Sequence, residues 1–148
     1  MKFLISGHRL FKLEKYSIEF IKIAIEDTIE QIVKKFGAGV GLSGMASGVD
    51  LWFCDACLLK NIPYQACIPF EEQKFEMSQE ESFHRDELIN KAIMVRQVRN
   101  SFMVSIASCG IIVWDGNKGG THNVFQQMIE NKKPFLWINP VSEKIIEV

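Results

Sequence analysis

The sequence lacks several features that would place it in a functional class at once. It has no excess of charge, because 17 lysine and arginine residues stand against 18 aspartate and glutamate residues and give a net charge of -1. No apolar run approaches the roughly 18 residues that a transmembrane helix needs, and the first apolar stretch is too short for a signal peptide. We therefore expect a cytoplasmic protein that avoids membranes and has no global attraction for nucleic acid.

Cysteine is also scarce, with 4 residues in the chain of 148. Cys54 and Cys57 form a CxxC pair, but neither a second CxxC nor a nearby histidine completes a zinc site. A reduced cytosolic chain of this size needs no disulfide scaffold. We expect packed thiols, no metal and no cofactor. Redox or metal chemistry at the CxxC pair is the alternative.

Short apolar strands alternate with helices along the whole chain, without a linker, a repeat or a low-complexity tract. The patterns predict strands over residues 2–7, 39–44, 63–70, 93–98, 110–116 and 134–140. They predict helices over residues 16–36, 49–60, 78–92, 99–108 and 121–132, and a loop over 8–15. Parallel strands need crossovers and are buried on both faces. We therefore predict one domain over residues 1–148, an α/β fold with a doubly wound, mainly parallel sheet and helices on both faces.

Ligands of such folds bind beyond the carboxyl ends of the strands, where the strand order reverses. The loops after Gly7, Gly44, Pro69 and Asp115 are therefore the predicted site. SGMASGVD, residues 43–50, is the first of two glycine-rich turns there. It places two glycines between a strand and a helix whose free N–H groups and dipole favour an anion.

The SGMASGVD turn carries several polar candidates. Ser43 and Ser47 add hydroxyl donors, and Asp50 either caps the helix or holds a ribose hydroxyl. The spacing matches neither a dinucleotide fingerprint nor a Walker A loop, so a tight turn without a ligand is the alternative. If the turn binds phosphate, Gly44→Val or Gly48→Val should abolish binding without unfolding the chain.

WDGNKGGTHN, residues 114–123, is the second glycine-rich turn between a strand and a helix. Gly119 and Gly120 permit close backbone approach, Thr121 is a candidate N-cap and phosphate donor, and Lys118 adds charge. A capped helix after a simple turn is the alternative. Asp115 also has a structural interpretation, as an acceptor for loop amides.

Three further segments bring polar side chains near the predicted edge. In SGHR, His8 is either a ligand contact or a local hydrogen-bonding group, and Arg9 is either an anion-binding fork or a solvated loop residue. Arg99 and Asn100 open a predicted helix near the same edge. Residues 84–86, HRD, lie on a charged helix, where a solvated face is the simpler interpretation.

The motifs SGHR, SGMASGVD, RNSFMV and IIVWDGNKGGT, in this order, resemble the SLOG superfamily. That superfamily joins the Rossmann-like domain of DNA-processing protein A with the LONELY GUY cytokinin-activating enzymes and several nucleotide-sensor domains. The resemblance covers roughly residues 3–140. It implies a Rossmann-like fold, a nucleotide or nucleotide-derived ligand with phosphate at residues 44–48 and 119–121, and a homo-oligomer.

The sequence departs from the enzymes of this superfamily at the glutamates that assist N-glycosidic cleavage. Their positions correspond to Asn123 and Val124, neither of which can act as an acid or a base. Enzymatic activity therefore stays open, with Asp50 or Asp115 as candidate catalytic residues. The near-neutral charge argues against nucleic acid as the partner, since DNA-binding surfaces are basic.

We therefore expect a sensor or sequestering protein for a nucleotide-derived molecule, such as an ADP-ribose-like or cyclic signalling nucleotide. A nucleotide N-glycosidic hydrolase is the first alternative, and a single-stranded DNA-binding protein is the second. The candidate ligand-binding residues are Gly7, His8, Arg9, Ser43, Gly44, Met45, Ala46, Ser47, Gly48, Asp50, Arg99, Asn100, Asp115, Gly116, Gly119, Gly120 and Thr121.

Overall fold

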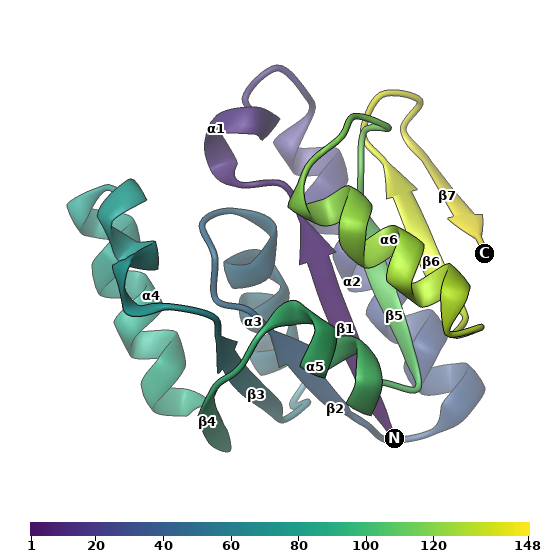
Figure 1. Ribbon diagram of the computed structural model, residues 1–148, viewed down its shortest axis with the longest axis horizontal. Coiled ribbons are helices and arrows are strands. Elements are labelled where there is room, and N and C mark those ends of the chain that lie inside the picture. The colour runs from purple at the N-terminus through teal and green to yellow at the C-terminus, as the bar shows by residue number, and fades with distance from the viewer.

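A computed structural model describes the backbone of residues 1–148 and every side chain except those of Glu71 and Glu72. Its centre is a seven-stranded sheet in the order β4-β3-β2-β1-β5-β6-β7 (Figure 1). The strands are β1 Lys2–Gly7, β2 Val40–Ser43, β3 Tyr64–Ile68, β4 Met94–Gln97, β5 Cys109–Val113, β6 Phe135–Asn139 and β7 Lys144–Glu147. All neighbours pair in parallel except β6 and β7. The predicted α/β fold is confirmed.

Helices cover both faces of the sheet, as the alternating pattern predicts (Figure 1). They are α1 Leu10–Leu13, α2 Ile18–Phe36, α3 Val49–Leu59, the 3-10 helix η1 Glu71–Glu76, α4 Gln79–Lys91, α5 Asn100–Ile106 and α6 Gly120–Glu130. The α2, α3 and α4 helices pack on one face, and α5 and α6 pack on the other. Within the described residues, no helix is both long enough and apolar enough to cross a bilayer.

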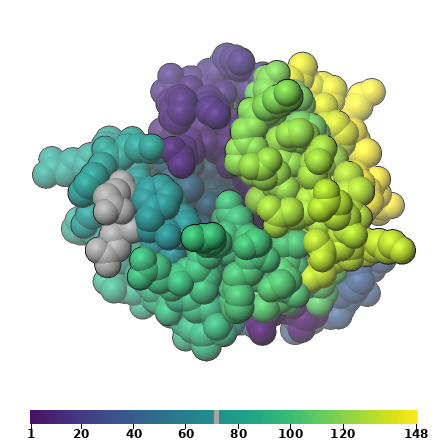
Figure 2. All heavy atoms as spheres, viewed as in Figure 1, coloured from purple at the N-terminus to yellow at the C-terminus, as the bar shows by residue number. Residues whose placement is uncertain are grey.

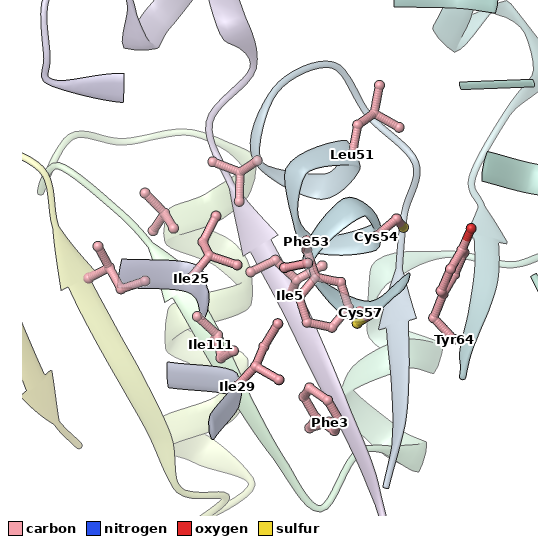
Figure 3. Close-up of a cluster of buried hydrophobic side chains, with 14 of the residues drawn as sticks. Phe3, Ile5, Ile25, Ile29, Leu51, Phe53, Cys54, Cys57, Tyr64 and Ile111 are labelled. Atoms are coloured by element: carbon pink, nitrogen blue, oxygen red, sulfur yellow. The ribbon is translucent and has the colours of Figure 1, made fainter. Parts of the chain in front are cut away.

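The larger core lies between the sheet and α2, α3 and α4 (Figure 3). Phe3 and Phe53 meet edge to face there, with ring centroids 5.6 Å apart. Cys54 and Cys57 of the CxxC pair lie in this core as free thiols with almost no exposed surface. Burial raises the pKa of both thiols, that of Cys57 to about 12. A neutral thiol is a poor nucleophile and a poor metal ligand, so the geometry favours packing.

Strand order places the reversal point at β1. Because β1 pairs with β2 on one side and β5 on the other, the chain segments that leave these strands diverge at their carboxyl ends. Binding crevices of open α/β sheets form at such a point. The segments after β1, β2, β3 and β5 therefore surround the centre of this edge.

Besides the 3-10 helix η1, two elements were not predicted from the sequence. Residues 10–13 form the one-turn helix α1 inside the predicted loop, anchored by the fully buried Leu13. Residues 144–147 form β7, which closes a hairpin with β6. A single helical turn is too short to show a period, and the side chains of β7 are mostly exposed, so neither segment has the apolar pattern that identifies an element.

Candidate functional site

A cleft of about 360 Å³ opens at the carboxyl edge of the central strands. In the space-filling view, the surface is hollowed between the N-terminal segment around α1, the residues after β3, and the helices α5 and α6 (Figure 2). Nine residues that the sequence predicted for the site line it: Gly7, His8, Arg9, Gly44, Ala46, Asp50, Asn100, Gly120 and Thr121. Its volume is typical of small-molecule sites.

The other predicted residues surround the cleft without lining it. They are Ser43, Met45, Ser47, Gly48, Arg99, Asp115, Gly116 and Gly119. Ser43 and Met45 are completely buried, whereas Arg99 and Gly116 are exposed. The glycine-rich turns therefore present only part of their length to a ligand.

The SGMASGVD turn is held by its own side chains. The Ser43 hydroxyl donates to the Asp50 carbonyl oxygen at 3.0 Å and accepts from the Met45 amide at 3.2 Å. The Ala46 amide donates to Asp50 Oδ2 at 3.2 Å. Asp50 therefore stabilises the loop before α3. The interpretation that its side chain caps the helix is wrong, because Gly48 is the N-cap residue.

The N-terminus of α3 already holds an anion from the protein. The Glu81 carboxylate of α4 accepts the Ser47 hydroxyl at 2.8 Å and the Gly48 amide at 3.3 Å. A carboxylate at this position satisfies the helix dipole and an otherwise unpaired N–H group. The Gly48 amide is therefore already paired within the protein, and phosphate binding at residues 44–48 stays a prediction.

Gly48 also approaches the protein's own backbone closely. A Cβ atom there would lie 2.8 Å from the Leu10 nitrogen, and the residue has φ of +86°. Only glycine combines this conformation with this contact. The prediction that Gly48→Val leaves the fold intact is therefore wrong.

Arg85 and Gln73 hold the SGMASGVD turn in place by hydrogen bonds to its carbonyl groups. Arg85 donates from Nε to the Met45 carbonyl at 3.1 Å and from Nη2 to Gln73 Oε1 at 2.9 Å. Gln73 Nε2 donates to the Gly44 carbonyl at 2.9 Å. Burial lowers the pKa of the Arg85 guanidinium. The expected solvated face is wrong for Arg85, which is 4% exposed.

The start of α6 is the open helix N-terminus of the cleft. Gly119 occupies the N-cap position without a side-chain cap, so the prediction of Thr121 as N-cap is wrong. Thr121 is buried in the first turn and lines the cleft, and no described group hydrogen-bonds its hydroxyl. Lys12 faces this turn, with its Nζ atom 3.7 Å from where a Gly119 Cβ would lie. No described carboxylate pairs with this ammonium group.

His8, Tyr16 and Asp115 form a polar cluster beside the cleft. Asp115 accepts the Tyr16 hydroxyl at 2.9 Å and the Asn117 amide at 3.0 Å. Burial opposes ionisation of Asp115, but these hydrogen bonds and His8 outweigh it and lower its pKa. The interpretation of Asp115 as an acceptor for loop amides is confirmed.

His8 Nε2 faces two groups of Asp115, the carboxylate Oδ1 at 3.0 Å and the backbone amide at 3.1 Å. A proton on Nε2 would bind the carboxylate, and an unprotonated Nε2 accepts the amide. Burial lowers the pKa of His8 despite the opposing effect of Asp115. The ring is therefore neutral near pH 7 and holds the start of the second turn against β1.

Asp50 carries the one carboxyl group among the described residues that line the cleft. Its side chain is buried, and desolvation raises its pKa to about 7, against the hydrogen bond from Ala46 and the charge of Arg9. A carboxyl group with this pKa exchanges a proton near neutral pH, as a general acid or base does. Asn123 is exposed and Val124 is buried, so neither supplies a second carboxylate.

Two solved proteins illustrate the fold that the structural comparisons find. One is TM1055, a structural genomics target, with a TM-score of 0.58, 12% sequence identity, and 90% of this chain and 71% of that chain covered. The other is DNA processing protein A from Helicobacter pylori, with a TM-score of 0.65, 16% identity, and 93% of this chain and 64% of that chain covered. The Helicobacter protein is described as having a single-stranded DNA binding mode.

No protein-family model and no curated protein matches the sequence. The structural likeness confirms the fold that the SLOG resemblance implies, a Rossmann-like domain shared with DNA processing protein A. The chain spans slightly less than two thirds of the length of the Helicobacter protein, at 64%.

Proposed function

We propose that the cleft binds a small nucleotide-derived anion whose phosphate group lies at the start of α6. The juxtaposition of Lys12 and the uncapped turn at Gly119 carries this proposal. An ammonium group and the positive end of a helix repel each other unless an anion lies between them. A phosphate there accepts from both, and from the Thr121 hydroxyl.

The remaining cleft residues fit the other parts of such a ligand. Gly120 has open space around the position of a Cβ atom, so a ligand can reach the backbone there. Arg9 lies at the mouth, where it pairs with Glu76. Asp50 lies across the cleft, and its carboxyl group can donate to or accept from a sugar hydroxyl.

Binding without cleavage is the function that this residue set supports best. The glutamates of the LONELY GUY enzymes are replaced by Asn123 and Val124, and Asp50 is the single described carboxyl group in the cleft. Cleavage of an N-glycosidic bond by Asp50 is the second candidate, because its raised pKa suits proton transfer.

A ligand screen tests these functions directly. Thermal shift assays with ADP-ribose, NAD, cyclic nucleotides and nucleoside monophosphates should give a specific rise in Tm for at least one compound, because a ligand stabilises the state that binds it. Native mass spectrometry of the mixture shows whether the compound is recovered intact. Release of a free base would favour the hydrolase, and no shift with any of them would contradict the binding proposal.

Lys12→Ala should lower the affinity for the identified ligand by about tenfold, because a charged hydrogen bond contributes about 1.5 to 3 kcal/mol. Lys118→Ala is the matched control, since Lys118 is exposed and lies outside the cleft. Isothermal titration calorimetry at two salt concentrations measures both variants. Equal affinities of Lys12→Ala and Lys118→Ala would contradict the assignment of Lys12.

Single-stranded DNA is a further candidate because the Helicobacter protein is described as binding it. Phe11 and Phe70 line the cleft as exposed rings beside Arg9 and Lys12. Aromatic and cationic side chains together form stacking grooves for single strands. Fluorescence anisotropy with labelled oligothymidine over a salt series tests this, and a steep loss of affinity with salt is the expected signature.

A further inference from the structure

The two helix starts beside the cleft differ in charge. At α6, Lys12 faces an uncapped helix start, whereas the neighbouring start of α3 is occupied by Glu81. A second phosphate group at α3 would have to displace this carboxylate or lie beside it. The cleft therefore favours a ligand with its anionic group at one end only.

The opposite side of the cleft carries a partly exposed aromatic ring. Pro69 and Phe70, which follow β3, line this side, and the buried Gln73 lines the cleft from the same segment. Phe70 is 39% exposed. Leaving part of an aromatic ring exposed in a concave site is unfavourable, and covering it with another planar ring recovers that free energy.

Strand order sets the separation between the two ends. The segment with Phe70 follows β3 and α6 follows β5, and β2 and β1 lie between these strands. Three strand spacings of about 4.8 Å place the two ends about 14 Å apart. A free phosphate cannot bridge this gap, whereas a phosphate joined through a sugar to a ring extends along it.

We infer that Phe70 forms a stacking subsite for a planar ring and makes the cleft select ring-bearing phosphates over aliphatic ones. This inference rests on the proposed phosphate position at α6. It assigns the discrimination between ligands to a side chain outside both glycine-rich turns. Phe70 recognises the flat face of the ligand ring and not its hydrogen-bonding groups. Different bases should therefore be accepted.

Calorimetric titration with AMP and ribose 5-phosphate tests the subsite, since the two probes share the phosphate and the sugar. The wild-type chain should bind AMP more tightly than ribose 5-phosphate. Phe70→Ala should lower the affinity for AMP by about tenfold, within the range seen when stacking rings are removed, and leave that for ribose 5-phosphate unchanged. Phe70→Trp should restore AMP binding.

Phe83→Ala is the matched control, because Phe83 on α4 is 67% exposed and lies outside the cleft. It should leave both affinities unchanged. If the wild-type chain binds both probes equally, the stacking subsite is overturned while the proposed phosphate site stands. If Phe70→Ala lowers the affinity for both probes equally, the stacking subsite is also overturned, because stacking should affect only the probe that carries a ring. If neither probe binds the wild-type chain, the subsite for ring-bearing monophosphates is overturned, and the wider ligand screen decides the proposed function.

Discussion

Gly48→Ala is expected to lower the free energy of unfolding by about 3 kcal/mol or more, the sum of backbone strain and overpacking. The added Cβ would lie 2.8 Å from the Leu10 nitrogen and 3.1 Å from the His8 carbonyl oxygen. Neither backbone atom can rotate away as a side chain would. The φ of +86° adds strain, since residues with a side chain rarely adopt it.

Urea denaturation of Gly48→Ala and Gly120→Ala measures this effect against a matched glycine of the second turn. Gly120 has no heavy atom within 4 Å of a Cβ position, so its replacement should be neutral or slightly stabilising. The pair also distinguishes effects on folding from effects on binding. Gly120 lines the cleft and Gly48 does not, so a side chain at Gly120 can affect the ligand without destabilising the fold. Equal stability of Gly48→Ala and the wild-type chain would show that the segment of residues 8–10 does not pack as the structure places it.

The Gly48 contact illustrates which part of the site the sequence predicts. Glycine between a strand and a helix indicates that something approaches the backbone closely, and this is correct. The sequence does not say whether the approaching group is a ligand or another segment of the chain. At Gly48 it is the start of α1, the segment predicted as a loop.

Helix α4 shows a similar limit. Ser78 and Glu81 have the spacing of a capping box, and the Ser78 hydroxyl does accept the Glu81 amide at 3.0 Å. The Glu81 side chain, however, leaves its own helix and binds Ser47 and Gly48. The local pattern predicts the helix start correctly, but a contact between residues 34 positions apart depends on tertiary packing.

A signal for the buried face of α4 is nevertheless present in the sequence. Glu81, Arg85 and Leu88 are spaced by four and three residues, so they lie on one face of the helix. Leu88 is almost completely buried, and the two charged residues next to it on this face point at the SGMASGVD turn. The position of Arg85 on the same face as Leu88 therefore indicates that Arg85 is buried.

The cation of the proposed phosphate site lies on a different segment from the one suggested by the sequence. Lys118, adjacent in sequence to the glycines of the second turn, is exposed and outside the cleft. Lys12 reaches Gly119 from α1, more than a hundred residues earlier in the chain. Sequence proximity favoured Lys118, but the strand order brings the end of β1 beside the end of β5. Such long-range pairings become visible only in the fold.

Asp50→Asn is expected to stabilise the protein above pH 7 and to leave its stability near pH 4 almost unchanged. Burial raises the pKa of Asp50 from 3.8 to about 7. Between these values the folded state keeps the proton and the unfolded state has released it, so stability falls as the pH rises. About three pKa units at 1.36 kcal/mol each make the full loss about 4 kcal/mol.

Asparagine removes this pH dependence because it carries no charge, and its side-chain oxygen can still accept the Ala46 amide. Urea denaturation at several pH values between 4 and 8 measures the difference between variant and wild type. Asp27→Asn is the control, since Asp27 lies exposed on α2 and forms no ion pair among the described residues, whereas Asp55 pairs with His84. A constant difference across the whole range would contradict the burial of an ionisable group at Asp50.

The same variant also tests why a carboxyl group lies at this position at all. A buried residue that lowers stability near neutral pH persists where its function compensates for the loss, which is the usual trade-off at binding and catalytic sites. Asp50→Asn should therefore bind the identified ligand more weakly while it unfolds at a higher urea concentration at pH 8. A variant that gains stability and keeps full affinity would assign Asp50 to the architecture of the loop alone, through its hydrogen bond with Ala46.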